Sequence, residues 1–180
     1  MGSVFITGGS RGIGAACVRA FAEAGRPAAF TYSARRDKAE ALAAETGALA
    51  LCADSADRDA VENAVKTARE SLGAIDTVVC NAGIAQQKLF QDITDDEWLT
   101  MLNVNLMGAV RTIRAALPDM LHRQKGSIVI VSSMWGERGA SCESHYAASK
   151  AALIGLSKSL ALELGPSGIR VNCVAPGVIG

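Results

Sequence analysis

The sequence has no excess of charge of either sign, and this absence argues against several classes of protein. It carries 18 Lys and Arg residues against 18 Asp and Glu residues, so the net charge is zero. Proteins that bind nucleic acids or membrane surfaces normally show a basic excess. We therefore expect no nucleic-acid partner and no membrane partner.

Long hydrophobic runs, targeting signals and paired cysteines are missing as well. No apolar stretch approaches the roughly 18 residues of a membrane span, and Met1-Gly2-Ser3 lacks the basic start and cleavage site of a signal peptide. The five cysteines are odd in number and include no C-x-x-C pair, which disfavours a disulfide framework or a metal site. We expect a cytoplasmic protein in which most of these thiols are small core residues. They are Cys17, Cys52, Cys80, Cys142 and Cys173.

What is present is an alternation of apolar, strand-length runs with longer stretches of helical periodicity. At 180 residues and 49% hydrophobic, the chain fits a single domain over residues 1–180. Strands are expected at 4–7, 27–32, 48–52, 75–80, 127–132 and 169–174, and helices at 13–24, 35–46, 57–72, 95–124 and 145–164. Several strand runs are apolar without alternation, as in parallel strands covered on both faces. This order predicts a doubly wound α/β sheet with right-handed crossovers.

A glycine-rich turn joins the first expected strand to the first expected helix. Its sequence is Thr7-Gly8-Gly9-Ser10-Arg11-Gly12-Ile13-Gly14. Glycines in this context permit a tight turn, let backbone N–H groups approach a pyrophosphate and let the helix pack close to the strand. The helix N-terminus adds a partial positive charge. The turn therefore predicts a dinucleotide site.

Two other interpretations of the same turn remain open. The run from Gly8 to Gly12 also matches the G-x-S-x-G nucleophile elbow, with Ser10 as a hydrolase nucleophile and His122 or His145 as its base. That elbow would lie on the first strand, where no earlier strand supplies an oxyanion-hole loop. A glycine-rich turn without a ligand is the third interpretation.

Three later clusters favour a nicotinamide enzyme. Cys80-Asn81-Ala82-Gly83 ends the fourth strand run, Ser132-Ser133 ends the fifth, and Tyr146-Ala147-Ala148-Ser149-Lys150 opens a helix. Residues four apart share one helix face, so Tyr146 and Lys150 can approach the same point.

These motifs, in this order, resemble those of the short-chain dehydrogenases/reductases. The resemblance runs from Thr7 to Ile179 and includes the T-G-x-x-x-G-x-G loop, Asn81-Ala82-Gly83, Val104-Asn105-Leu106, Ser133, the Tyr146/Lys150 pair and Pro176-Gly177. The 13-residue step from Ser133 to Tyr146 is also similar to the family's spacing. Cys80 departs from the pattern, because the family often has a second Asn there. The resemblance implies a Rossmann-type parallel sheet of order 3-2-1-4-5-6.

The resemblance implies a catalytic set of Ser133, Tyr146, Lys150 and Asn105. Hydride that reaches a carbonyl carbon leaves negative charge on the oxygen, where a proton donor is needed, and a free phenol with a pKa of about 10 is poorly matched to neutral pH. A Lys150 ammonium would favour the phenolate form of Tyr146, and Ser133 would stabilise the developing charge. Lys150 would also hold the nicotinamide ribose, and Asn105 would connect Lys150 to solvent through water.

The residues after the second strand run favour NADP(H) over NAD(H). NAD-specific proteins usually carry an acidic residue there, whereas this chain has Tyr32 and Ser33, followed by Arg35 and Arg36. Arginine suits a 2′-phosphate, although the two arginines could instead begin a solvated helix. The expected cofactor contacts are Gly8, Ser10, Arg11, Gly12, Ile13, Gly14, Tyr32, Ser33, Arg35, Asp54, Asn81, Ala82, Gly83, Tyr146, Lys150, Pro176, Gly177 and Ile179.

The resemblance implies reduction of a ketone to a secondary alcohol, and similar stretches in two groups of relatives suggest the substrate, the first group being the preferred interpretation and the second the alternative. Residues 146–160 and 167–172 are similar to the branch of the family that reduces 3-oxoacyl groups on acyl carrier protein. Residues 132–143 are similar to bacterial reductases of a 5-aminopentanone group on elongation factor P. A non-catalytic nucleotide-binding regulatory protein on the same fold is the alternative from another class.

The resemblance also bears on assembly and on the end of the chain. Family members are usually dimers or tetramers, and the helices at 95–124 and 145–164 would pair with their symmetry mates. In the family a substrate lid, a helix and a last strand follow Pro176-Gly177. This chain stops at Gly180, so we expect a C-terminally incomplete domain that lacks the lid and the last strand.

Overall fold

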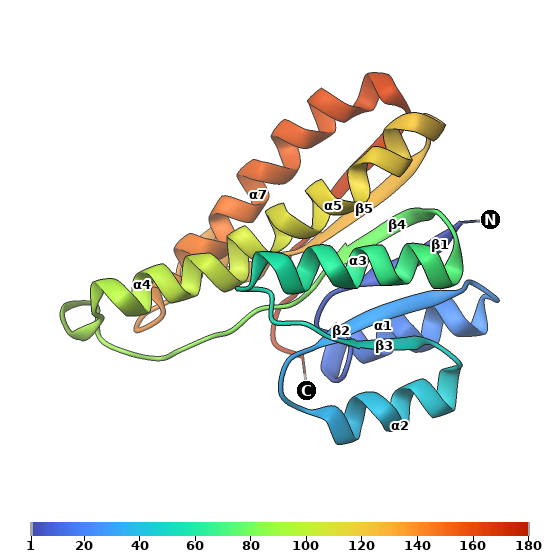
Figure 1. The fold of residues 1–180 in the computed structure, drawn as a ribbon. Coiled ribbons are helices and arrows are strands. Elements are labelled where there is room, and N and C mark those ends of the chain that lie inside the picture. Colours follow the sequence, from blue (N-terminus) through green and yellow to red (C-terminus); the bar gives the residue numbers. More distant parts are fainter. Residues whose placement is uncertain (1, 180) are drawn as a thin grey trace.

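A computed structural model describes residues 2–179 and shows one six-stranded sheet of order β3-β2-β1-β4-β5-β6 (Figure 1). All five strand pairs are parallel. The strands are β1 (Ser3–Ile6), β2 (Ala28–Tyr32), β3 (Leu49–Cys52), β4 (Ile75–Cys80), β5 (Gly126–Val131) and β6 (Ile169–Val174). The expected order and fold class are confirmed, and each strand lies within one residue of its expected range. The ends of the expected domain, residues 1 and 180, lie outside the described residues.

Helices cover both faces of the sheet. They are α1 (Gly12–Glu23), α2 (Arg36–Thr46), α3 (Arg58–Leu72), α4 (Asp95–Leu102), α5 (Gly108–Arg123), α6 (Met134–Arg138) and α7 (Ser144–Leu164). In β1, Val4 and Ile6 belong to the core cluster that contains side chains of α1 and α2, whereas Phe5 belongs to the cluster that contains side chains of α3, α5 and α7. This alternation follows from the two-residue period of a strand. It explains why the run is apolar throughout.

The stretch expected as one helix at 95–124 is interrupted. Thr94 caps α4 in a capping box with Glu97, and a five-residue π-turn, η2 (Asn103–Met107), separates α4 from α5. The Arg111 guanidinium donates to the Ser55 carbonyl (3.1 Å) and the Asn103 carbonyl (3.2 Å). The expected range is therefore helical throughout, from Asp95 to Arg123, but the π-turn means that it is not one regular α-helix. A π-turn inserts one residue into the helical repeat. Here the contacts of Arg111 hold that turn, and the spacing of apolar residues in the sequence does not reveal such contacts.

The cysteines need a partial correction. Of the five, only Cys80 is fully buried, while Cys17 and Cys173 are partly buried and pack against the core. Cys52 and Cys142 are exposed, because β3 is an edge strand and Cys142 lies in the loop before α7. All five are free thiols.

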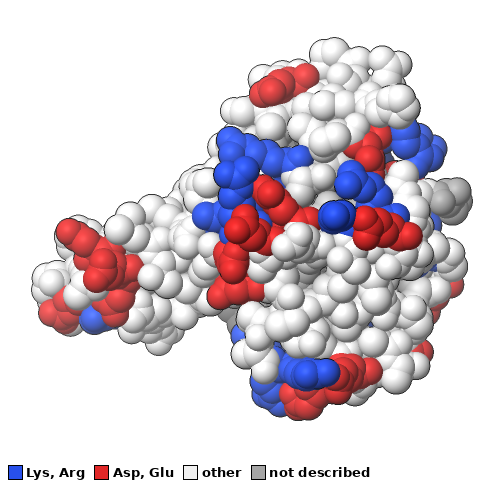
Figure 2. All heavy atoms as spheres, viewed as in Figure 1, with Lys and Arg blue, Asp and Glu red and all other residues white. Residues whose placement is uncertain are grey.

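Charges of both signs are interspersed over much of the face in Figure 2. Acidic side chains gather at the far end of the arm that α4 forms, where Asp95, Asp96 and Glu97 make up the first turn. Negative charge in the first turn of a helix is favourable for its dipole. Within residues 2–179, no helix combines the length and the apolar character that crossing a membrane requires.

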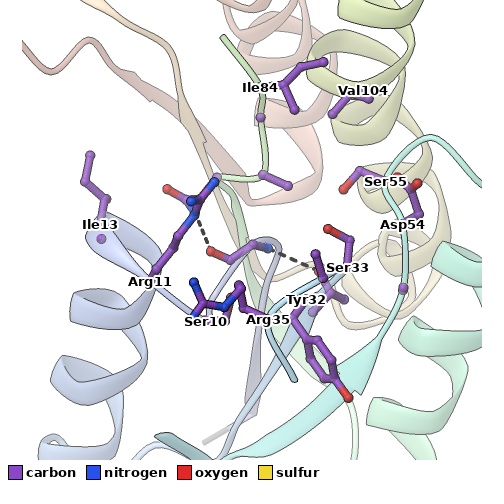
Figure 3. A pocket seen from close by; sticks show the side chains of 18 of the residues that line it. Ser10, Arg11, Ile13, Tyr32, Ser33, Arg35, Asp54, Ser55, Ile84 and Val104 are labelled. Atoms are coloured by element: carbon purple, nitrogen blue, oxygen red, sulfur yellow. Dashed lines mark hydrogen bonds between the residues drawn. The ribbon is translucent and has the colours of Figure 1, made fainter. Parts of the chain in front are cut away.

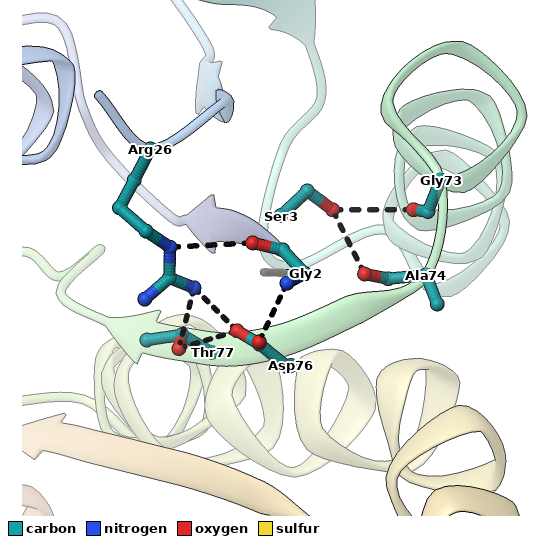
Figure 4. Close-up of polar contacts among 7 residues, drawn as sticks. All are labelled: Gly2, Ser3, Arg26, Gly73, Ala74, Asp76 and Thr77. Carbon is teal, nitrogen blue, oxygen red and sulfur yellow. Dashed lines mark hydrogen bonds and ion pairs between the residues drawn. The ribbon is translucent and has the colours of Figure 1, made fainter.

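A polar network ties the amino ends of β1 and β4 together, away from the carboxyl ends of the strands (Figure 4). Arg26 donates to the Gly2 carbonyl (3.2 Å) and pairs with Asp76, and the Gly2 N–H donates to Asp76 (2.8 Å). Burial opposes ionisation of Asp76, but hydrogen bonds from Thr77 and Gly2 and the charge of Arg26 outweigh it. The pKa of Asp76 therefore lies below its usual 3.8. The carboxylate is the centre of this network.

We expect the Asp76→Asn variant to lose about 1–3 kcal/mol of unfolding free energy at neutral pH, because Arg26 keeps a largely buried guanidinium without its counter-charge. The folded pKa is depressed, so the stabilisation is present above pH 3.8 and is lost as pH falls through the folded value. Urea unfolding at pH 7 and at pH 3 measures the unfolding free energies of the variant and the wild type. The difference between them should be smaller at pH 3. Glu62→Gln, in the exposed pair with Arg58, is the control and should cost less than about 0.5 kcal/mol. An unchanged gap at pH 3 would contradict the assignment.

Candidate active site

The glycine-rich turn has the conformations that its sequence requires. Gly8 and Gly12 have φ angles of +66° and +53°, in the left-handed region that favours glycine. A Cβ on Gly14 would lie 2.2 Å from the Gly8 carbonyl oxygen, so only glycine lets α1 pack this close to the turn. At Gly8, Gly12 and Gly14 the turn therefore depends on the absence of a side chain.

Thr7 and Asn81 join this turn to the end of β4. The Thr7 hydroxyl accepts hydrogen bonds from the backbone N–H groups of Asn81 and Ala82, both 3.0 Å long. The Asn81 side chain donates to the carbonyls of Thr7 (3.1 Å) and Gly8 (3.0 Å). Asn81 therefore shapes the turn as well as facing the cleft beside it.

A cleft of about 740 Å³ opens at the carboxyl ends of β1 to β4, within the size range of small-molecule sites. Figure 3 shows Ile84 and Val104 across this cleft from Ser10 and Tyr32. This is the point where the strand order reverses, which is the usual ligand site of such sheets. Twelve of the expected cofactor residues line it: Gly8, Ser10, Arg11, Gly12, Ile13, Tyr32, Ser33, Arg35, Asp54, Asn81, Ala82 and Gly83.

Two charged residues of this cleft, Arg35 and Asp54, have hydrogen-bond partners within the protein. Arg35 lines the cleft, but its guanidinium makes two hydrogen bonds to Asp37, at 3.0 and 3.2 Å. The bond from Arg35 lowers the pKa of Asp37 to about 2, so the carboxylate stays charged at neutral pH. Arg36 pairs instead with Glu40 and does not line the cleft. Asp54 accepts a hydrogen bond from the Ala56 N–H (2.9 Å), which helps to form the turn after β3.

A second cleft continues from the first, because Arg11, Ile13, Asn81, Gly83 and Ile84 line both. The remaining expected residues at its walls are Ser133, Tyr146, Lys150, Pro176, Gly177 and Ile179. Two expected residues line neither cleft. Gly14 is buried beneath the turn, and Asn105 is buried inside η2.

Lys150 is a buried cation held at its tip. It is 4% exposed, and its Nζ donates to the Val131 carbonyl (2.9 Å) at the end of β5. Burial lowers the pKa of Lys150 from 10.5 to about 8, and the nearby Cys173 opposes this shift. The Nζ lies 5.7 Å from the centre of the Tyr146 ring. The positive charge is therefore close to the phenol.

Ser133 and Asn105 are held by the backbone around them. The Ser133 hydroxyl caps α6 and accepts from the Trp135 N–H at 3.2 Å. The Asn105 side chain accepts from the Ile84 N–H (2.8 Å) and donates to the Ile84 carbonyl (3.0 Å) and to Ser149 (3.0 Å). These contacts tie η2 to the loop after β4 and to α7, and a further contact joins Asn105 Nδ2 to Met101 Sδ of α4 (3.1 Å).

The hydrolase arrangement is not formed. Ser10 lines the glycine-loop cleft, His145 is buried and bonded to Gln86, and His122 is exposed in the last turn of α5. Among residues 2–179, no hydrogen bond joins Ser10 to either histidine. In the same part of the chain, no three His, Cys, Asp or Glu side chains gather closely enough to hold a metal ion.

Several contributors were missed by sequence reasoning. The Thr7 hydroxyl, the Val131 carbonyl and Ser132, whose hydroxyl donates to the Lys150 carbonyl (2.8 Å), all position the predicted residues. Thr7 and Ser132 lie inside the quoted motifs, so their place was the available signal. No side-chain pattern identifies a backbone carbonyl.

Comparisons with known proteins agree with this geometry. The sequence pattern of the family described as short chain dehydrogenase matches residues 3–180. The 3-oxoacyl-(acyl-carrier-protein) reductase FabG of Staphylococcus aureus is 39% identical over 182 residues, which cover 98% of this chain and 74% of the relative. The acetoacetyl-CoA reductase of a Synechocystis species is 40% identical over 176 residues, covering 98% and 71%.

A solved structure gives the same result. A mutant of a Serratia marcescens short-chain dehydrogenase/reductase superposes with a TM-score of 0.92 at 39% identity, covering 98% of this chain and 74% of that one. The chain belongs to the short-chain dehydrogenase family. It is therefore built as an oxidoreductase that works with a nicotinamide cofactor.

Proposed function

We propose that the protein reduces a ketone to a secondary alcohol with NADPH, most closely in the manner of a 3-oxoacyl-(acyl-carrier-protein) reductase. The observation that carries the proposal is the single cleft lined by Ser133, Tyr146 and Lys150, which continues into the glycine-loop cleft. A proton donor, a cation and a hydroxyl thus share one space with a dinucleotide cradle.

The residues present fit a dinucleotide. Gly8 and Gly12 put no side chain on the turn that begins α1, and a Cβ on Gly14 would collide with the turn itself. The twelve lining residues of the first cleft would hold the adenosine and phosphates, and Tyr146, Lys150, Pro176, Gly177 and Ile179 the nicotinamide half. When bound, the nicotinamide supplies the hydride.

The remaining chemistry belongs to the side chains of the second cleft. Tyr146 donates the proton to the carbonyl oxygen and is left as a phenolate. Lys150 stabilises that phenolate, and the attraction is strong because the Nζ is buried. Ser133 donates a hydrogen bond to the oxygen as charge develops there. Asn105 positions Ile84 and Ser149 around Tyr146 and Lys150.

The proposed preference for NADPH rests on the residues after β2. No acidic side chain occupies the end of that strand, where an NAD-specific site needs one. Arg35 and Arg11 line the cleft, and Arg35 would exchange the Asp37 carboxylate for a phosphate. The names of the relatives support the substrate class, because one acts on 3-oxoacyl groups and another on acetoacetyl-CoA.

We also propose that the chain works as one catalytic domain and associates as a homo-dimer or homo-tetramer. Both clefts form on the same sheet, so neither half of the chain holds the site alone. Leu162 on α7 is 83% exposed, and Gly155 on the same helix has open space beside it. An apolar, closely approachable helix face suits a symmetric contact.

The test is a fluorescence titration of the protein with NADPH and NADH, followed by acetoacetyl-CoA while nicotinamide absorbance is recorded. We expect tighter binding of NADPH and its oxidation by the thioester. Arg35→Ala should raise the NADPH dissociation constant roughly 10-fold, through loss of charge-assisted hydrogen bonds, and leave that of NADH unchanged.

Arg36→Ala is the matched control and should change neither affinity, since Arg36 lies outside the cleft. Failure of both nucleotides to bind would overturn the cofactor site. NADPH binding without turnover would overturn the thioester substrate, and would favour the aminopentanone reductase or the non-catalytic regulatory hypothesis instead.

A further inference from the structure

The segment between β4 and η1 (Phe90–Asp92) forms one wall of the second cleft. Ile84 and Ala85 line the cleft directly, as Tyr146 does. The segment has no regular structure from 81 to 89, so its position depends on side-chain and backbone contacts to its neighbours. These contacts decide how wide the cleft is at Tyr146.

Gln86 joins this segment to His145, while other bonds hold Ile84 to Asn105, Gln87 to Glu143 (3.1 Å) and the Lys88 N–H to the Cys142 carbonyl (2.7 Å). The Oε1 of Gln86 lies 2.9 Å from Nε2 of His145, and its Nε2 donates to Glu97 Oε1 at 2.8 Å. Because the amide nitrogen is used by Glu97, the oxygen faces the imidazole and His145 must donate from Nε2. The three side chains form a directed chain from α7 through the segment to α4.

Glu97, at the end of this series of hydrogen bonds, is itself held in place by several donors. Its carboxylate also accepts two hydrogen bonds from Lys88, both 2.8 Å, and one from the Thr94 N–H, also 2.8 Å. The bonds from Lys88, Thr94 and Gln86 lower the pKa of Glu97 to about 2, so it stays an anionic acceptor at neutral pH.

His145 connects the Gln86–Glu97 hydrogen bonds to Tyr146. It is fully buried, directly precedes Tyr146 in the first turn of α7, and packs edge-on against Trp98 of α4, with ring centres 5.7 Å apart. Its Nδ1 is buried without a hydrogen-bond partner. A buried imidazole that makes one hydrogen bond owes its place to that bond and to packing.

We infer that His145 is a positioning residue: through Gln86 it holds the middle of the segment from 84 to 89 against α7, in addition to the Asn105 bonds that hold Ile84, and so contributes to the space between Ala85 and the Tyr146 phenol. The carbonyl substrate must fit in that space. A displacement near 1 Å at a reacting group can cost on the order of 100-fold in rate. The expected effect on turnover rests on the proposed reaction. The hydrogen bonds that join His145, Gln86 and Glu97 do not depend on that reaction.

The test compares His145→Leu with His145→Gln, whose amide can donate to Gln86 as the imidazole does. In His145→Leu we expect kcat/KM for acetoacetyl-CoA to fall about 10-fold or more while the NADPH dissociation constant stays within about twofold. His145→Gln should recover most of the loss. Amide hydrogen exchange at 84–89 should quicken in His145→Leu only. His122→Leu, at the exposed histidine, is the matched control.

Two results would overturn the inference. One is a His145→Leu variant with unchanged kcat/KM and unchanged exchange at 84–89. The other is equal loss in His145→Leu and His145→Gln together with weaker NADPH binding, which indicates general packing. If wild type does not turn over the thioester, the proposed function fails, but hydrogen exchange and NADPH binding still decide the role of His145.

Discussion

Tyr146→Phe is expected to abolish nearly all turnover while NADPH binding remains. The substitution removes one oxygen from a side chain that lines the second cleft and keeps the ring that faces Lys150. A positioned general acid contributes about 100-fold to 10,000-fold to a rate. We expect kcat to fall near the upper end of this range, because among the described lining residues no other phenol or imidazole faces that cleft.

The measurement is a single-turnover and steady-state comparison by nicotinamide absorbance, with NADPH affinity measured by fluorescence. A fall in kcat with an unchanged dissociation constant assigns the proton transfer to Tyr146. Activity within about tenfold of wild type would mean that water or another group supplies the proton, and would remove Tyr146 from its proposed role.

Lys150→Met is expected to abolish activity and at the same time to stabilise the fold at neutral pH. The cation supports the phenolate, so its loss should lower kcat by about 100-fold or more. The same cation is costly to bury. Lowering its pKa from 10.5 to about 8 corresponds to on the order of 3 kcal/mol of destabilisation, which methionine does not incur.

The pH dependence gives the sign of this effect. Below pH 8 both folded and unfolded chains carry the proton, and the full cost of the buried charge is present. Between pH 8 and 10.5 the folded chain releases the proton first, so wild-type stability rises relative to the variant. Wild-type reduction should slow as pH rises through 8, because the phenolate then loses its cation.

Urea unfolding of both proteins at pH 7 and pH 10 measures the stability part. The stability advantage of Lys150→Met should shrink at pH 10. Lys158→Met is the matched control on the exposed side of the same helix, and it should change stability by less than about 0.5 kcal/mol. A destabilised, inactive Lys150→Met at pH 7 would show that the bond to the Val131 carbonyl outweighs the cost of burial.

Sequence patterns predict most of this fold because the strands are apolar on both faces and the helices have clear ends. Single residues mark some of these helix ends. Thr94 begins α4 with a capping box, and Gly47, in the left-handed conformation, ends α2. The strand order follows from the family resemblance together with the rules for parallel sheets. The short α6 was not predicted, since a five-residue helix has too few positions to show a period.

The π-turn is a feature that the spacing of apolar residues could not predict. Apolar spacing continues through Asn103–Met107, so a single long helix was the natural expectation. The turn depends on contacts that Arg111 makes with Asn103, eight positions earlier, and with the Ser55 carbonyl, 56 positions earlier. Long-range polar contacts of this kind have no local pattern.

The sequence motifs identify residues of the candidate site, but they do not identify the groups to which those residues are hydrogen-bonded. Ser133, Tyr146 and Lys150 meet at one cleft, as their motifs indicated. The motifs say nothing of the Val131 carbonyl that holds Lys150, or of Asp37 beside Arg35. The roles of these residues remain predictions, and the partners decide how the predictions should be tested.

The junction of β1 and β4 has a consequence for how much of this protein persists in a cell. Thr7 and Asn81 are 74 positions apart, and the nucleotide cradle exists only after they have met. A nucleotide bound there binds the folded chain alone, and at 100 times its dissociation constant it adds about 2.7 kcal/mol of stability. The supply of reduced cofactor would then govern the lifetime of the protein, by sheltering it from proteolysis, as well as its rate of turnover.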